Sequence, residues 1–336
     1  MSATDFSFLN GRSVLITGGT GSFGRAFVRS VLEKAKPQRL AIFSRDELKQ
    51  YEMAQEFAGH AHESALRFFI GDIRDQSRLE MALRDVEFVV HAAALKQVPT
   101  AEYNPFECIH TNVLGAENVV RAALRCGVKR VIALSTDKAA SPINLYGASK
   151  LAADKIFVAA NNLAGANGTR FAVARYGNVL GSRGSVVPLY RRLIADGAEF
   201  LPVTDERMTR FWITLEHGVN FVVSNLASMR GGEIFIPKIP SSTIIDLARA
   251  ISADIPIKII GVRPGEKLHE VMITEDDARS TVELNDRYVI QPAFAFWDSE
   301  AYADNGAARV SEGFRYGSDA ARRLTVDELK ALLATL

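Results

Sequence analysis

A glycine-rich turn between a predicted strand and a predicted helix constrains the fold of this 336-residue chain more than any other feature. The apolar run Ser13–Thr17 leads directly into Gly18-Gly-Thr-Gly21-Ser-Phe-Gly24, and an amphipathic stretch follows to Lys34. Glycine permits a tight turn and a close backbone approach, and the start of a helix presents unpaired N–H groups. This order predicts the first βα unit of a sheet that binds a dinucleotide by its pyrophosphate. The alternative is a tight turn without a ligand.

The same alternation continues over the first 180 residues. Short runs rich in Val, Ile, Leu and Phe show little period-2 alternation, which is typical of strands buried on both faces, and amphipathic stretches separate them. The pattern predicts an α/β protein with a Rossmann-type, doubly wound parallel sheet. The predicted strands are Ser13–Thr17, Arg39–Phe43, Arg67–Ile70, Phe88–Ala92, Arg130–Ser135 and Phe171–Tyr176, and the predicted helices are Gly24–Lys34, Arg45–Phe57, Gln76–Leu83, Pro105–Cys126 and Tyr146–Leu163.

Beyond about residue 180 the predicted elements become shorter and mixed. The predicted helices there are Leu189–Asp196, Glu216–Ser228, Thr243–Ser252 and Thr325–Leu333, and the predicted strands are Glu233–Ile236 and Ile257–Ile260. We therefore divide the chain into a nucleotide-binding Rossmann domain, residues 1–180, and a segment that is mainly a substrate-binding lobe with a C-terminal helix, residues 181–336.

Charge and composition exclude several classes of partner. Lys and Arg total 40 against 39 Asp and Glu, a formal charge of +1, so no overall field favours nucleic acid or an anionic membrane. No uncharged apolar run approaches the roughly 20 residues of a membrane span, and the first residues lack the pattern of a secretory signal. The two cysteines do not make a disulfide framework. We expect a cytoplasmic protein.

Residues after the next strands indicate which cofactor the turn would bind. The second strand ends at Ser44-Arg45-Asp46, where a hydroxyl and a guanidinium suit a 2′-phosphate, so NADP is favoured; Asp46 leaves NAD as the alternative. Asp72, after the third strand, is placed to reach an adenine amino group. The full set expected around the cofactor is Gly18, Thr20, Gly21, Ser22, Phe23, Gly24, Ser44, Arg45, Asp46, Lys49, Asp72, Ile73, Ala92, Ala93, Lys96, Tyr146, Lys150 and Val179.

A Tyr-x-x-x-Lys pair indicates hydride-transfer chemistry. Tyr146 and Lys150 are spaced i, i+4 at the start of a predicted helix, so their side chains share one face. A nearby lysine charge lowers the pKa of a phenol, and the tyrosinate can then remove a hydroxyl proton. Thr136, at the end of the preceding predicted strand, is expected to support Tyr146.

These motifs together resemble the extended short-chain dehydrogenase/reductases, and within them the UDP-N-acetylglucosamine 4,6-dehydratases. The resemblance rests on Ser44-Arg-Asp-Glu-Leu-Lys-Gln50, His91-Ala-Ala-Ala-Leu-Lys-Gln-Val-Pro99, Ser135-Thr-Asp-Lys-Ala-Ala140, Arg175-Tyr-Gly-Asn-Val-Leu-Gly181 and Arg263-Pro-Gly-Glu-Lys-Leu-His-Glu270. The closing Glu312-Gly-Phe-Arg-Tyr316 and Leu324-Thr-Val-Asp-Glu-Leu329 are most similar to the inverting branch that serves pseudaminic acid biosynthesis. The resemblance implies inversion at C5 and a homo-oligomer such as a hexamer.

The two residues that directly follow Thr136 favour a dehydration over a simple oxidation. Loss of water across C5–C6 of a sugar needs an acid for the C6 hydroxyl and a base for the C5 proton. Asp137 and Lys138 follow the fifth predicted strand at the end where α/β active sites lie. We expect Asp137 to be the acid and Lys138 the base; the alternative is a surface ion pair.

The substrate that the resemblance implies, UDP-N-acetylglucosamine, carries a diphosphate, so cationic residues are expected near it. By resemblance, the predicted substrate-binding residues are Lys96, Asn178, Arg210, Arg263 and Glu266. His60 and His62 have no third ligand nearby in the sequence, so no metal site is expected. The remaining functional alternatives are a retaining 4,6-dehydratase, a UDP-sugar 4-epimerase and an NADP-sensing regulator that performs no chemistry.

Overall fold

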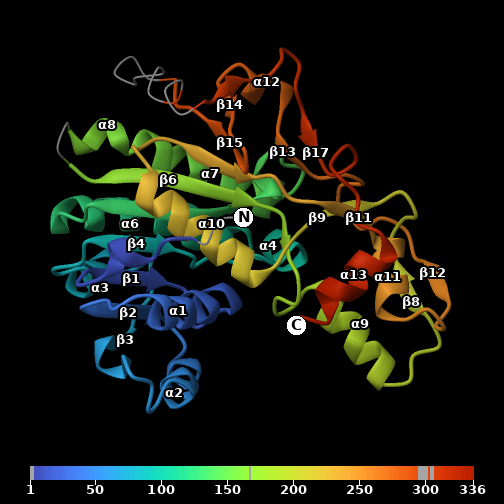
Figure 1. Cartoon of the computed structure of the whole chain (residues 1–336), viewed down its shortest axis with the longest axis horizontal. Coiled ribbons are helices and arrows are strands. Elements are labelled where there is room, and N and C mark those ends of the chain that lie inside the picture. The colour runs from blue at the N-terminus through green and yellow to red at the C-terminus, as the bar shows by residue number, and fades with distance from the viewer. Residues whose placement is uncertain (1–3, 166–167, 294–301, 303–305) are drawn as a thin grey trace.

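The computed structural model describes residues 4–165, 168–293, 302 and 306–336 (Figure 1). Its largest element is a ten-stranded sheet with the order β16-β14-β15-β10-β6-β5-β4-β1-β2-β3. The strands from β3 to β10 pair in parallel, and β15, β14 and β16 add an antiparallel edge. The order reverses between β1 and β4, so a crevice is expected outside the carboxyl ends of these strands. The predicted Rossmann-type fold is confirmed.

The six strands predicted in the first half form within one residue of their predicted starts and ends. They are β1 Ser13–Thr17, β2 Arg39–Ser44, β3 Leu66–Ile70, β4 Phe88–His91, β5 Arg130–Thr136 and β6 Arg170–Tyr176. All five residues of β1 are buried, and so are all four of β4. Burial on both faces explains why these runs are apolar without alternating.

Helices cover both faces of the sheet. The helices of the first half are α1 Ser22–Lys34, α2 Glu47–Glu56, α3 Gln76–Ala82, α4 Val98–Tyr103, α5 Pro105–Ile109, α6 Gly115–Cys126, α7 Leu145–Ala159 and α8 Asn161–Ala164. The predicted helix Pro105–Cys126 contains a π-helical turn, His110–Leu114, between α5 and α6. Helix α6 packs against α3 and α7, whereas α1 packs against α10 Leu215–Ser228 (Figure 1).

The second half contributes to both the sheet and a separate lobe. Strands β10 Ile234–Pro237, β14 Thr281–Glu283, β15 Arg287–Ile290 and β16 Ala308–Arg309 extend the large sheet. The large sheet therefore does not end at residue 180, because strands from residues 181–336 pair onto β6 and beyond. The lobe, at the right of Figure 1, contains α9 Val186–Ala195, α11 Ile244–Ile251, α13 Val326–Leu333, β8 Leu201–Val203 and β12 Ile257–Ile259.

The two larger hydrophobic cores of the described residues match this arrangement. The largest fills the layers around the sheet, and a smaller one joins α9, α11 and α13 through Tyr190, Leu247 and Leu329. The described residues also form three small sheets: β11 Ser241–Thr243 with β9 Thr209–Ile213 and β7 Asn178–Val179, β12 with β8, and β13 Val271–Ile273 with β17 Tyr316–Gly317. Short helix α12 spans Glu275–Ala278. None of the helices in the described ranges is long and apolar enough to cross a membrane.

Candidate active site

One cavity of about 1160 Å³ runs from the glycine turn to the second lobe. Its size suits two nucleotide-sized ligands side by side. Of the predicted site residues, every one except Asp137 lines it. The structure therefore brings together side chains from the carboxyl ends of β1, β2, β3, β4, β5 and β6 and from residues 178–266.

The glycine turn fits tightly against the end of β4. Gly18 has φ +66°, and a Cβ on it would lie 2.8 Å from the backbone nitrogen of Ala93. A Cβ on Gly24 would meet the carbonyl of Gly19 at 2.3 Å, so α1 starts in direct contact with the turn. Phe23 stacks on Tyr176 with ring centroids 6.5 Å apart. This backbone cradle fits a pyrophosphate at the start of α1.

Two cationic residues that follow β2, Arg45 and Lys49, line the cavity. The Asp46 side chain accepts from the backbone nitrogen of Lys49 at 3.0 Å as the cap of α2, and it also pairs with the Lys49 amine. Arg45 is half-exposed and lies 3.3 Å from Asp72, which Arg74 also contacts at 2.7 Å. Both carboxylates at this end are therefore already paired.

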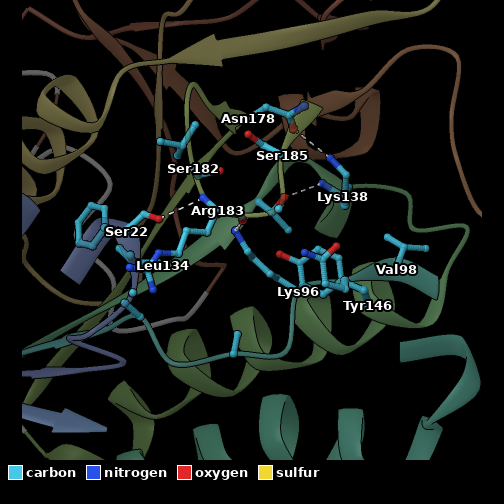
Figure 2. Close-up of a pocket in the computed structure, with 18 of the residues that line it drawn as sticks. Ser22, Lys96, Val98, Leu134, Lys138, Tyr146, Asn178, Ser182, Arg183 and Ser185 are labelled. Carbon is cyan, nitrogen blue, oxygen red and sulfur yellow. Dashed lines mark hydrogen bonds between the residues drawn. The ribbon is translucent and has the colours of Figure 1, made fainter. Parts of the chain in front are cut away.

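A glycine-containing loop crosses the cavity, and we call residues 181–185 the crossing loop. The backbone nitrogen of Arg183 donates to Ser22 Oγ at 3.2 Å, and Lys96 Nζ donates to the carbonyl of Arg183 at 3.0 Å (Figure 2). Burial lowers the pKa of Lys96. The loop is thus tied to the glycine turn on one side and to the segment after β4 on the other. Arg183 was not among the predicted residues.

Tyr146 and Lys150 share one face of α7, as their spacing predicts. Burial raises the pKa of Tyr146 to about 12, although the Lys138 charge and the Thr136 hydroxyl act to lower it. Lys150 Nζ donates to the carbonyl of Leu134 at 2.7 Å, and burial lowers the pKa of this amine. Lys150 is thus bonded to the end of β5, and the charge of Lys138 also acts on the phenol.

A buried charge cluster lies where β5 ends. Lys138 Nζ contacts Asp137 Oδ1 at 3.0 Å and Glu270 Oε1 at 3.2 Å. It also donates to Asn178 Oδ1 at 3.3 Å (Figure 2). Asp137 is fully buried, and its Oδ1 also accepts from Thr136 at 2.9 Å. Burial raises the pKa of Asp137, with Glu270 adding to the effect and Lys138 opposing it. Asp137 thus lies behind the cavity wall, and Lys138 lies on it.

Two of the predicted substrate-binding arginines differ in how many of their guanidinium groups' hydrogen bonds are already made within the protein. Arg210 is buried, and its two terminal nitrogens donate to the carbonyls of Thr209, Lys267 and Leu268 at 2.7–3.1 Å. Arg263 is half-exposed and lies 3.7 Å from Glu266. Arg210 therefore braces the backbone of this segment, and Arg263 keeps more of its guanidinium free for a phosphate.

Sequence reasoning missed Glu270 as a site residue. It lines the cavity although it is only 2% exposed. Glu270 is the last residue of the motif Arg263–Glu270, so its place in that motif could have marked it as a candidate site residue. What the sequence lacked was any sign that this carboxylate meets Lys138.

A family model described as polysaccharide biosynthesis protein matches residues 14–292. The chain is 57% identical over 316 residues to the UDP-N-acetylglucosamine 4,6-dehydratase (inverting) of Campylobacter jejuni subsp. jejuni serotype O:23/36 (strain 81-176), covering 92% of this chain and 93% of the relative. It is 41% identical over 333 residues to the UDP-glucose 4-epimerase of Rickettsia canadensis (strain McKiel), covering 97% and 96%.

Two solved structures share the fold of this chain and also resemble it in sequence. Pen from Bacillus thuringiensis has a TM-score of 0.89 and 35% identity, and the match covers 98% of each chain. DesIV, a dTDP-glucose 4,6-dehydratase from Streptomyces venezuelae with NAD and TYD bound, has a TM-score of 0.70 and 26% identity, and the match covers 87% of this chain and 97% of that one.

Proposed function

The chain belongs to the polysaccharide biosynthesis protein family matched over residues 14–292, and we propose that it is an inverting UDP-N-acetylglucosamine 4,6-dehydratase, a carbon–oxygen lyase. The 57% identity to a dehydratase of that name supports the substrate and the reaction. The 4-keto product is proposed to be UDP-2-acetamido-2,6-dideoxy-β-L-arabino-hexos-4-ulose, for pseudaminic acid or related nucleotide-sugar synthesis. The inverted C5 is taken from the relative's name.

The observation that carries the proposal is the charge cluster beside Tyr146. A 4-epimerase only has to oxidise and reduce C4, whereas a dehydratase also needs acid and base groups at C5 and C6. An amine on the cavity wall, in contact with two buried carboxyl groups, supplies such groups within reach of the tyrosine. The same cluster argues against a regulator that performs no chemistry.

Each chemical step has a residue of this chain assigned to it. Tyr146, supported by Thr136 and Lys150, takes the proton from the C4 hydroxyl. The resulting 4-keto group acidifies the C5 hydrogen. Transfer of one proton from the Lys138 ammonium to Asp137, 3.0 Å away, gives the amine that removes this hydrogen as base and the carboxylic acid that supplies a proton to the departing C6 hydroxyl. Because Asp137 lies behind the cavity wall, its proton has to reach the hydroxyl past Lys138. A proton then returns to C5 from the opposite face, which inverts that carbon.

A nicotinamide dinucleotide fits the cradle at Gly18–Gly24, and NADP is proposed over NAD. A nicotinamide held there would supply the reversible hydride acceptor that C4 oxidation and C6 reduction need, and the cofactor would end each turnover as it began. The guanidinium of Arg45 and the amine of Lys49 suit a 2′-phosphate. Asp46 already caps α2, so it is not free to accept from a ribose hydroxyl. The crossing loop helps to explain retention of the cofactor between the hydride transfers.

The two parts of the chain have separate proposed tasks. Residues 1–180 hold the cofactor, and residues 181–336 mainly hold the substrate, with Arg263 on the diphosphate, Glu266 on the ribose and Asn178 and Lys96 near the sugar. The resemblance also suggests a homo-oligomer, with a hexamer as one form, and a cytoplasmic location. Both stay predictions.

Incubation of the purified protein with UDP-N-acetylglucosamine in deuterated water tests the reaction. The proton spectrum should show loss of the C6 hydroxymethyl group and deuterium at C5, and the C5 configuration of the product distinguishes inversion from retention. Interconversion at C4 with C6 intact would identify an epimerase and refute the dehydratase proposal.

A further inference from the structure

Glu270 is a buried carboxylate whose close contact in the described structure is a single amine. It lies just before β13 and is 2% exposed. Its Oε1 lies 3.2 Å from Lys138 Nζ, while Arg210 Nε and Lys267 Nζ are both 3.9 Å from the carboxylate. Its Oε2 is buried and has no hydrogen-bond partner among the described residues. A carboxylate buried with so few partners is costly unless its charge is needed where it lies.

The backbone that carries Glu270 is fixed from several directions. The backbone nitrogen of Glu270 donates to Ser318 Oγ at 2.9 Å, and its carbonyl accepts from the Ser318 nitrogen at 2.8 Å. Arg210 holds the carbonyls of Lys267 and Leu268, and Lys267 Nζ donates to the carbonyl of Ala140 at 2.7 Å. These bonds hold the segment that carries Glu270 against the turn that follows Lys138. The Glu270 carboxylate therefore lies beside the Lys138 amine.

Lys138 has all three of its donors engaged. Its acceptors are Asp137, Asn178 and Glu270. Although burial alone would lower the pKa of Lys138, the two carboxylates outweigh it and raise that pKa; Arg210 opposes them. From α7, Tyr146 also faces this charge. The amine is therefore held in one orientation and kept cationic before substrate arrives.

We propose that Glu270 is a positioning residue for the dehydration: its carboxylate aims the Lys138 amine at the sugar ring. The proposal rests on the proposed function. With Asp137 as its only partner, the Lys138 amine would be drawn away from the cavity, because Asp137 does not line it. Glu270 lines the cavity, so its carboxylate attracts the amine towards the space where the substrate would bind. The cation also lies beside Tyr146, so the same contact favours the tyrosinate that begins the reaction.

Glu270→Gln separates charge from shape, because the amide keeps an oxygen acceptor for Lys138 and removes the negative charge. Glu270 acts on the substrate only through Lys138, so its loss should impair the chemical step more than substrate binding. We expect kcat for dehydration to fall at least about tenfold while KM stays within about twofold.

Two further variants make the reading specific. Glu270→Asp keeps the charge on a shorter side chain, so it should recover part of the kcat that Glu270→Gln loses. Glu233→Gln is the matched control, since Glu233 is equally buried but contacts the nitrogens of Arg230 and Gly231 and the Tyr302 hydroxyl, outside the cavity. It should reduce thermal stability without lowering kcat.

The outcomes distinguish the inference from its premise. If the unaltered protein does not dehydrate UDP-N-acetylglucosamine, the proposed function is wrong. If it does, and Glu270→Gln keeps its kcat within experimental error, the positioning role is overturned. If Glu270→Gln does not fold, Glu270→Asp decides: an unchanged kcat overturns the proposal, and a reduced kcat at an unchanged KM supports it.

Discussion

Replacing Lys138 by alanine should remove dehydration and also destabilise the fold, by an amount that follows from its contacts. Nζ lies 3.0 Å from Asp137 Oδ1 and 3.2 Å from Glu270 Oε1. At an effective dielectric constant of about 20, each contact is worth roughly 5 kcal/mol of Coulomb energy before the desolvation cost is subtracted. Since removal of the amine leaves buried carboxylate charge behind, we expect Lys138→Ala to lower the free energy of unfolding by about 3–5 kcal/mol near neutral pH.

This loss should shrink in mild acid. Burial acts to raise the pKa of Glu270, but Lys138, Arg210 and Lys267 outweigh it and lower that pKa in the intact protein. A lowered carboxylate pKa contributes stability above the ordinary pKa of about 4, and that stability is lost as the pH falls through the folded pKa. Without Lys138 the pKa of Glu270 rises, so the carboxylate takes up a proton at a higher pH and the variant recovers relative to the unaltered protein.

Urea unfolding at pH 8 and pH 5 measures the difference, and NMR in deuterated water measures turnover. Lys129→Ala is the control, because the exposed Lys129 also pairs with a glutamate, Glu87, at 2.6 Å. A surface pair of this kind is worth about 0–1 kcal/mol. The reasoning fails if Lys138→Ala is as stable as Lys129→Ala at pH 8, or if it still dehydrates the substrate at a normal rate.

Three further variants test other parts of the site. Tyr146→Phe should reduce turnover about 10²–10⁴-fold because it removes the group that takes the C4 proton; a near-normal steady-state rate would exclude that role. Arg45→Ala should weaken NADP binding at least about tenfold relative to NAD, because a charge-assisted contact to phosphate is lost; calorimetric titration with both cofactors would contradict this if the ratio of affinities did not change. Gly18→Ala should reduce cofactor retained after gel filtration and lower the melting temperature more than Gly59→Ala does, since both glycines have positive φ but only Gly18 has backbone within 3.0 Å of the added Cβ. Equal effects of the two alanines would mean that backbone strain, about 1–2 kcal/mol, accounts for the whole change.

Local patterns in the sequence were enough to predict the strands of the first half of the chain. Strands such as β1 and β4 are buried on both faces, so their residues must be continuously apolar, and that requirement is visible without knowing their neighbours. The glycine turn and the Tyr146–Lys150 pair are also local, because one turn of backbone or helix sets their geometry. The last predicted helix, Thr325–Leu333, is present as α13 for the same reason, because a capping box between Thr325 and Glu328 starts it.

The second half was harder to predict because its elements depend on distant partners. Strands of two or three residues, such as β7, β8 and β17, are too short to carry a period of their own. They exist because another segment pairs with them, as β9 does with β7. Strands β14, β15 and β16 likewise join the large sheet only through β10.

The sequence by itself determined which chemical groups stand at the ends of the strands: the glycines at residue 18 and beyond, the tyrosine and lysine one helical turn apart, and an acid beside an amine after β5. Only the tertiary structure decided how they are paired. It put Asp137 behind the wall, turned Lys150 to the carbonyl of Leu134 and brought Glu270 to Lys138. The physical reason is that a charge removed from water must find a partner, and which partner it meets depends on chain segments far apart in sequence that touch only once the lobes have packed.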